Sequence, residues 1–372
     1  MVDLVNQYKR IEQEINKAVL NVFNHGRFIN GPEVSQFAEN LAQYLNVKHV
    51  VPVANGTEAI LIALMGLGIQ PGDEVIVPAF TYIATVEVIA FLRAVPVLVD
   101  VDMATFNINV GQIEEAISER TKAVIPVHLY GQAANMQQIL EIARQHNLGV
   151  IEDNAQSLGA EYTFSDGHRQ KTGTMGDIGT TSFFPTKNLG GYGDGGAIFT
   201  DSDELYKKMR MIANHGQNKK YFHKYVGLNS RLDTVQAAIL NVKLKYLDEY
   251  ISKRQQAAKM YDERLSDIEQ IILPSVQQDR THVFHQYTIT LKTNNRDELK
   301  QYLADKGIPT QIYYPLPIHW QEAYKQIVKL PVSLDNSEFL SEHVLSLPMH
   351  TELTEEHIDF VSETIKSFFR NK

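Results

Sequence analysis

Short apolar runs alternate with helix-like segments through the first two thirds of this 372-residue chain, and that alternation constrains the fold most. We expect strands at 49–54, 74–78, 95–99, 122–127, 148–152, 179–184 and 196–200. Strands separated by helices favour a largely parallel sheet, because each helical connection returns the chain to the same end of the sheet. The pattern predicts an α/β fold, with a mostly parallel mixed sheet sandwiched by helices.

The chain is also longer than one hydrophobic core usually supports. We expect a large domain at 1–245 and a smaller α/β domain at 246–372, bridged by a long helix at 233–265. Periodicity and turn residues predict the remaining elements: a half-buried strand at 282–291, helices at 296–308 and 354–371, and an exposed hairpin at 163–173 that turns at Asp166–Gly167.

Lys187 lies in an almost charge-free, glycine-rich run at 179–200, GTTSFFPTKNLGGYGDGGAIFT. A lysine among aromatic and glycine residues loses hydration, which lowers the pKa of its amine. A neutral amine can form a Schiff base, and pyridoxal phosphate is the common cofactor that uses one. This cofactor needs an acid for its ring nitrogen, a cradle for its phosphate and a flat group against its ring.

Asp153 is the candidate acid, since it follows the apolar run 148–151 and open α/β sheets bind ligands at the carboxyl ends of their strands. An aspartate there would pair with a protonated pyridine nitrogen and keep it protonated. The alternative is that Asp153 and Glu152 only cap a strand or bind a metal.

The candidate phosphate cradle is the turn 55–57, where a β-branched strand gives way to a helix. Free amides at a helix start attract anions. Gly56 would let the backbone approach closely, Thr57 would add a donor, and Ser182 could add another from a neighbouring loop. The alternative is an ordinary helix start, because polar caps are routine there.

Tyr82 is the candidate flat group, because it follows the predicted strand 74–78. Its ring could stack on the cofactor. With 17 tyrosines in the chain, plain core packing is an equally simple interpretation.

These residues resemble the DegT/DnrJ/StrS family of nucleotide-sugar aminotransferases, which have the type I fold of aspartate aminotransferase. The resemblance runs from about residue 3 to about 348. It is carried by these segments: 31-GPEVSQFAENLAQYL-45, 54-ANGTEAI-60, 71-PGDEVIVPAFTYIAT-85, 121-TKAVIPVHLYGQ-132, 151-IEDNAQSLGA-160, 181-TSFFPTKNLGGYGDGGAIFT-200, 214-NHGQ-217, 227-GLNSRLDTVQAAIL-240 and 314-YPLPIHWQEAY-324.

The resemblance implies that Lys187 forms the Schiff base with pyridoxal 5'-phosphate and that Asp153 pairs with its pyridine nitrogen. It places Gln156 near the cofactor's phenolic oxygen and Tyr82 against the ring. The cofactor would alternate with pyridoxamine 5'-phosphate as glutamate, the usual donor of the family, gives up its amino group.

The resemblance also implies that Gly56, Thr57 and Ser182 hold the phosphate, joined by Asn229 from a second subunit. The active sites would then be shared within a homodimer. An N-terminal cap on a helix that begins near Leu232 is the alternative for Asn229.

The substrate is expected to be a nucleotide-linked keto sugar. After the lysine the chain reads KNLGGYGDGG, which resembles members that act on 3-keto sugars, above all on a UDP-linked 3-keto-N-acetylglucosaminuronic acid. Arg231 would suit a sugar carboxylate, or it could pair with Asp233 or belong to a solvated face. Tyr314 and His319 are further substrate contacts. Tyr313 is also a candidate substrate contact, and it stands where those relatives tend to have histidine.

We expect a UDP- or dTDP-linked 3-keto sugar to be aminated for surface polysaccharide or glycoconjugate biosynthesis. The alternatives are a 4-keto-sugar aminotransferase and a sensor that binds pyridoxal phosphate without catalysis. A dehydratase of the same fold would have histidine in place of Lys187. A nicotinamide-binding fingerprint at 191–196 lacks the required strand before it and helix after it.

Composition narrows the remaining classes. The chain has no cysteine, which excludes disulfides and thiolate catalysis, and its net charge of −9 argues against a nucleic-acid surface. Its 13 histidines show no ligand spacing, so we expect no metal. Neither a secretory leader nor a long apolar run is present, which favours a cytoplasmic protein that does not enter a membrane.

Overall fold

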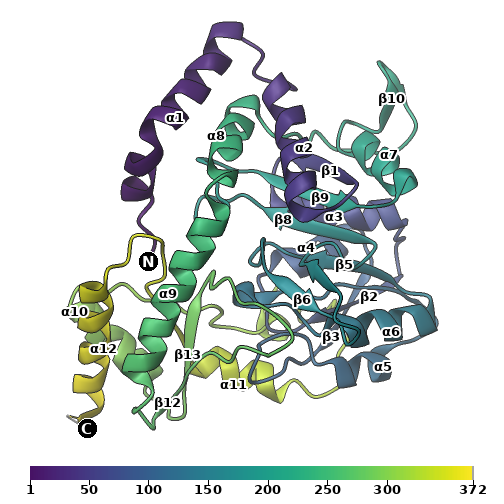
Figure 1. The fold of residues 1–372 in the computed structure, drawn as a ribbon. Helices are drawn as coiled ribbons and strands as arrows, with labels where there is room; N and C mark the ends of the chain where they lie inside the picture. Colours follow the sequence, from purple (N-terminus) through teal and green to yellow (C-terminus); the bar gives the residue numbers. More distant parts are fainter. Residues whose placement is uncertain (371–372) are drawn as a thin grey trace.

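This computed structural model describes residues 1–370, in which a seven-stranded sheet forms the centre of the molecule (Figure 1). In spatial order the strands are β1 (His49–Val53), β9 (Gly196–Thr200), β8 (Ile178–Ser182), β5 (Gly149–Asp153), β4 (Thr121–Val124), β2 (Glu74–Pro78) and β3 (Val95–Val99). All pairs are parallel except the two that β9 makes with β1 and β8. The predicted mostly parallel mixed sheet is confirmed.

Helices cover both faces of this sheet. The helices of residues 1–370, in chain order, are α1 (Leu4–His25), α2 (Pro32–Leu45), α3 (Gly56–Leu67), α4 (Ala84–Phe91), η1 (Val110–Gln112), α5 (Ile113–Ala116), η2 (Leu129–Gly131), α6 (Met136–His146), α7 (Asp203–Ile212), α8 (Thr234–Leu244), α9 (Leu247–Leu265), α10 (Arg296–Asp305), η3 (Ile318–Trp320), α11 (Asp335–His343) and α12 (Glu355–Arg370). On β2, Val75 and Val77 pack in one core with α3 and α4, whereas Ile76 packs in another with α6. Alternate side chains of one strand thus enter opposite cores.

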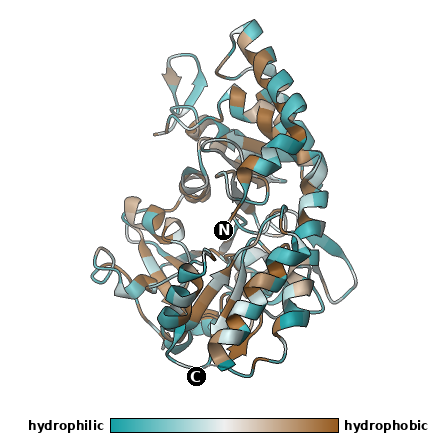
Figure 2. Ribbon diagram, turned by 90° about the vertical axis from the view of Figure 1, so that its left-hand side faces the viewer, coloured by the Kyte–Doolittle hydropathy of each residue, from teal (hydrophilic) through white to brown (hydrophobic). Residues whose placement is uncertain are grey.

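A second sheet lies nearer the C-terminus, with the order β12 (Ile271–Ile272), β13 (Tyr287–Leu291) and β14 (Val344–Leu347). Its core draws on α9, α10 and α12, which Figure 1 shows together at the end of the molecule that holds the C-terminus. The domain division at residue 245 stays a prediction. Figure 2 shows mostly hydrophobic residues in the central strands and both kinds along the outer helices.

The predicted helix at 233–265 is two helices, and the single-helix prediction is wrong. The regular helix is interrupted at residues 245–246, where the Tyr246 amide donates to Lys243 O at 3.0 Å through a tighter turn and its φ is −103°. The regular period of apolar residues continues across this break, so the sequence pattern does not reveal it.

The predicted strand at 282–291 is shorter and more buried than expected. Only β13 joins a sheet, and every residue in it is buried because it lies between β12 and β14, while His282 makes an isolated antiparallel bridge with Gln132. Residues 282–286 instead fold against the loop that follows β4, where Val283 N donates to Gly131 O at 2.9 Å.

The predicted hairpin is present, with β6 (Glu161–Thr163) paired to β7 (Arg169–Lys171) and Gly167 at a φ of +85° in its turn. A second hairpin, β10 (Gln217–Lys219) and β11 (Phe222–His223), projects beside α7 (Figure 1). The predicted helix 354–371 is α12, and residue 371 lies outside the described residues.

Residues 1–370 contain no helix of the length and apolarity that crossing a membrane requires. They also contain no cluster of three or more metal-ligating side chains.

Candidate active site

The carboxyl ends of β5, β8 and β2 meet at one edge of the sheet, and the candidate residues gather there. Asp153 ends β5 and is 6% exposed. Thr85 Oγ1 donates to one of its carboxylate oxygens at 2.8 Å, and Ala155 N donates to the other at 3.1 Å. Each oxygen therefore has one fixed donor and keeps lone pairs free for a further one.

The loop that carries Lys187 is closed by backbone contacts. Lys187 N donates to Phe184 O at 2.9 Å, and Gly191 N donates to Phe183 O at 2.8 Å. Burial lowers the pKa of the Lys187 amine to about 8, although the nearby charge of Asp153 opposes that shift. The fold thus brings the candidate amine and the candidate acid together and lets the amine lose its proton near neutral pH.

Gly56 and Ser182 face each other at the start of α3. A Cβ on Gly56 would lie 2.7 Å from the Cβ of Ser182, so only glycine fits there without movement. Asn55 caps the helix, taking the Glu58 amide on its side chain at 2.8 Å and the Ala59 amide on its carbonyl at 3.1 Å. The amides of Gly56 and Thr57 precede any intrahelical acceptor and are available to an anion.

Gln156 links the site to two tyrosines. Its Oε1 accepts from Tyr130 N at 2.7 Å, and its Nε2 donates to the Tyr314 hydroxyl at 3.0 Å. Burial raises the pKa of Tyr314, with smaller contributions from neighbours that include Asp153 and Tyr82. The Tyr82 ring lies 6.0 Å from that of Tyr314 and is 56% exposed, so core packing is the wrong interpretation of Tyr82.

Asn229 and Arg231 lie near the cradle without forming part of it. Ser230, between them, accepts a hydrogen bond from Ala54 N at 3.2 Å. Asn229 is exposed. It does not cap α8, because Asp233 occupies the N-cap position, so the capping interpretation is wrong.

Arg231 borders a cavity of about 990 Å³, and within residues 1–370 it makes no ion pair with Asp233. Other basic side chains border the same cavity: Lys48, Lys207, Arg210, Lys219 and Lys220.

The other two candidate substrate contacts are tied to the protein itself. His319 Nε2 lies 2.9 Å from Glu338 Oε1, and the ring is nearly buried. Tyr313 is half-buried, and its carbonyl accepts a hydrogen bond from the Tyr130 hydroxyl.

Sequence reasoning missed several residues that shape the site. Thr85 ends a segment that carried the family resemblance, so its position three residues after Tyr82 could have drawn attention to it. Gln236, in α8, accepts a hydrogen bond from Tyr192 N at 2.8 Å and so holds the glycine-rich loop. No local sequence pattern indicates this contact. His285 is buried, which holds its pKa well below its usual range, and the charge of Lys187 contributes.

The site fits a phosphorylated pyridine ring. Three groups that such a ring requires lie near the same edge of the sheet. They are a carboxylate for the ring nitrogen, an amine that can lose its proton and bond to an aldehyde, and two free amides for the phosphate. The close approach of Gly56 to Ser182 favours a phosphate site over an ordinary helix start.

Comparisons with known proteins agree with this geometry. Residues 9–366 match the DegT/DnrJ/EryC1/StrS aminotransferase family. The chain is 45% identical to the "Pleiotropic regulatory protein" of Geobacillus stearothermophilus, covering 100% of this chain and 98% of that one. It is 44% identical to the "UDP-2-acetamido-2-deoxy-3-oxo-D-glucuronate aminotransferase" of Pseudomonas aeruginosa, covering 95% of each.

A solved structure also superposes closely. The Bacillus subtilis protein NtdA with bound cofactor PMP has a TM-score of 0.88 and 36% identity, covering 96% of this chain and 82% of that one.

Proposed function

The chain belongs to the DegT/DnrJ/EryC1/StrS aminotransferase family, and we propose that it transfers an amino group from glutamate to a nucleotide-linked 3-keto sugar. Its cofactor is pyridoxal phosphate, which when bound acts as an electron sink and carries the amino group between the substrates. One observation carries the proposal: the buried amine of Lys187, with a pKa of about 8, lies near the fixed carboxylate of Asp153.

In this proposal each side chain holds one part of the cofactor. Lys187 would hold the aldehyde carbon and move protons there. Asp153, whose carboxylate is held by Thr85 and Ala155, would keep the pyridine nitrogen protonated. Tyr82 would lie against the ring, and Gln156 would lie near the phenolic oxygen. Positioning is the main contribution of these residues to the rate.

The phosphate would be bound by Gly56, Thr57 and Ser182, with Asn229 of a second copy completing the cradle. Exposed apolar side chains support a homodimer. Along α1 and the loop after it, Leu20 is 57% exposed and Phe23 is 54% exposed, and a groove of about 610 Å³ beside α1 is lined mainly by apolar residues. Soluble monomers rarely leave such a continuous apolar surface open.

The sugar is proposed to be 3-keto and UDP- or dTDP-linked, in a pathway to surface polysaccharide or another glycoconjugate. The KNLGGYGDGG loop and the 44% identical Pseudomonas relative support that choice. Arg231 would meet a sugar carboxylate, and Tyr313, Tyr314 and His319 would line the rest of the sugar site. The cytoplasmic location stays a prediction.

A sensor that keeps the cofactor without turnover is the second candidate, because the 45% identical relative carries a regulatory name. Incubation with glutamate and a panel of UDP- and dTDP-linked 3-keto and 4-keto sugars separates the two. Release of 2-oxoglutarate with a 3-keto sugar is the expected result. Release of 2-oxoglutarate with 4-keto sugars alone would show that the amino group is transferred to C4 of the sugar. Cofactor binding without any release of 2-oxoglutarate would support the sensor.

A further inference from the structure

A second carboxylate, Glu152, lies one residue before Asp153 on β5 and is fully buried. Because side chains alternate along a strand, the two carboxylates point to opposite faces of the sheet. Four donors surround Glu152: His128 Nε2 at 2.8 Å, Gly173 N at 2.8 Å, Met175 N at 2.6 Å and Gly176 N at 2.7 Å. A carboxyl group faced by four donors serves only as an acceptor.

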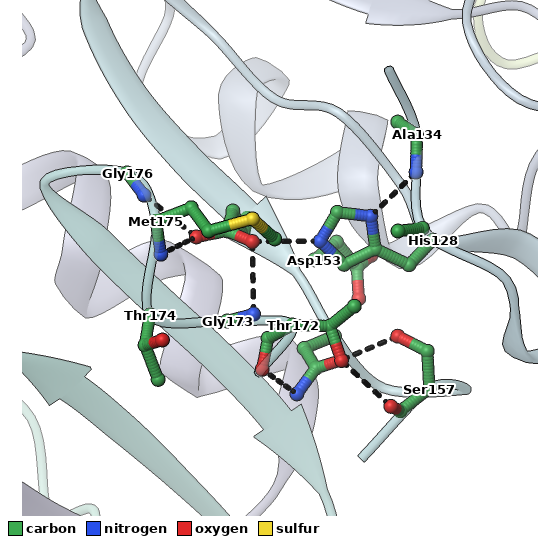
Figure 3. Close-up of polar contacts among 12 residues, drawn as sticks. His128, Ala134, Asp153, Ser157, Thr172, Gly173, Thr174, Met175 and Gly176 are labelled. Atoms are coloured by element: carbon green, nitrogen blue, oxygen red, sulfur yellow. Dashed lines mark hydrogen bonds and ion pairs between the residues drawn. The ribbon is translucent and has the colours of Figure 1, made fainter. Parts of the chain in front are cut away.

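His128 is also fully buried, and its contacts fix which ring nitrogen carries the proton (Figure 3). Ala134 N donates to Nδ1 at 3.0 Å, so Nδ1 accepts. The proton of the neutral ring is therefore on Nε2, which donates to Glu152. With Nδ1 engaged in this way, the ring has no other tautomer that satisfies both contacts.

The same histidine holds Asp153 through its backbone. His128 N donates to Asp153 O at 3.1 Å, and Asp153 N donates to Pro126 O at 2.9 Å. His128 thus contacts both carboxylate residues at once, Asp153 through the main chain and Glu152 through the imidazole. The loop 173–176 donates three further hydrogen bonds to Glu152, and Figure 3 labels the donors Gly173, Met175 and Gly176.

We propose that Glu152 and His128 are positioning residues that hold the end of β5, and with it the Asp153 carboxylate, in register with the cofactor's pyridine nitrogen. This rests on the proposed role of Asp153. If the two residues had a purely structural role, they would only anchor the loop 173–176, and replacing them would lower stability alone. A positioning role also affects how tightly the cofactor binds and how its ring titrates.

Glu152→Gln tests the pair without changing its shape. Whichever way the new amide turns, its NH₂ faces two of the four donors, so the end of β5 must shift. We expect the dissociation constant of the cofactor to rise about tenfold, as when residues that orient the direct ligands of a bound group are replaced. We also expect the pH midpoint of the cofactor's visible band to move in the same direction as in Asp153→Asn.

Glu74→Gln is the matched control. Glu74 is a fully buried carboxylate at the opposite end of β2, paired with Arg120 at 2.7 Å and Lys329 at 3.1 Å. Its loss should lower the Tm and leave the cofactor's dissociation constant and pH midpoint unchanged.

His128→Gln and His128→Leu provide a second test if Glu152→Gln does not fold. Glutamine keeps an N–H that can reach Glu152, whereas leucine does not, so we expect the pH midpoint near the wild-type value in the first and displaced in the second. The proposal is overturned if both variants titrate alike, or if Glu152→Gln matches Glu74→Gln. If Asp153→Asn itself leaves the midpoint in place, the proposed role of Asp153 fails instead.

Discussion

Gly56 and Ser182 approach each other so closely that a Cβ on Gly56 would stand 2.7 Å from the Cβ of Ser182 and 3.3 Å from its Oγ. The two residues come from different elements, one at the start of α3 and the other at the end of β8. Their approach brings a hydroxyl to the free amides of a helix start, which is what an anion site requires.

Gly56→Ala should therefore weaken cofactor binding. The added methyl forces Ser182 away from the cradle, at a cost of about 1–3 kcal/mol for overpacking. The measurement is the dissociation constant of pyridoxal phosphate by absorbance titration. Gly111→Ala is the control, because its nearest neighbour would be 3.4 Å from the new Cβ. Equal affinity in both variants would contradict the assignment of the cradle.

The capture of cofactor by the cofactor-free protein should rise with pH around a midpoint near 8. Burial lowers the pKa of Lys187 to about 8, so the reactive neutral amine is available well below the ordinary lysine pKa of about 10.4. The sign for stability follows from the same shift. Between these two values the unfolded chain binds more protons, so this group's contribution to the free energy of unfolding rises with pH.

Lys243 supplies the control for that measurement, since burial lowers its pKa to about 8 as well. It lies in α8, with Nζ 4.8 Å from the centre of the Tyr192 ring. Lys243→Met should leave the pH midpoint of capture in place, whereas Lys187→Ala should abolish the visible band. A midpoint that follows Lys243 would remove the basis for assigning Lys187.

Tyr82→Phe should bind cofactor like the wild type, while Tyr82→Ala should lose about 0.5–1.5 kcal/mol of binding free energy. The ring, rather than the hydroxyl, is expected to make the contact. Phe360→Ala removes a ring of similar exposure, 55%, from α12 and serves as the control. The dissociation constant is the measurement, and equal affinity in Tyr82→Ala and Phe360→Ala would refute a stacking role.

Mixing two inactive variants tests the shared site. If Asn229 completes the cradle of the partner subunit, Lys187→Ala and Asn229→Ala chains should regain activity when refolded together, because a mixed dimer contains one intact site. The readout is 2-oxoglutarate release from the mixture against each variant alone. Should the mixture stay as inactive as its parts, Asn229 acts within its own subunit.

Arg231→Ala should raise the KM for a carboxylated 3-keto nucleotide sugar by roughly ten- to a hundredfold, since a hydrogen bond to a charged group contributes about 1.5–3 kcal/mol. The KM for an uncharged 3-keto sugar should rise much less in Arg231→Ala. Arg231→Lys should restore only part of the affinity for the carboxylated sugar, because an ammonium cannot form the planar fork. Equal losses for both sugars would show that Arg231 does not read the carboxylate.

Local sequence patterns predicted the strands of the main sheet to within a few residues, because each strand is a short apolar run between turn residues. They misjudged the helix that breaks at Tyr246 and the strand β13. Tertiary packing decides both cases. The apolar periodicity continues through the break at Tyr246, and the neighbours of β13 bury a face that an isolated strand would expose.

The sequence by itself determined the chemistry that is available: a lysine in an uncharged glycine loop, an aspartate at a strand end and a glycine at a helix start. Only the tertiary structure decided what surrounds those groups. It set the distance between Gly56 and Ser182, lowered the pKa of Lys187 and brought Thr85 and His128 to Asp153. Burial and hydrogen-bond geometry depend on segments far apart in the chain, and no local pattern encodes their separation.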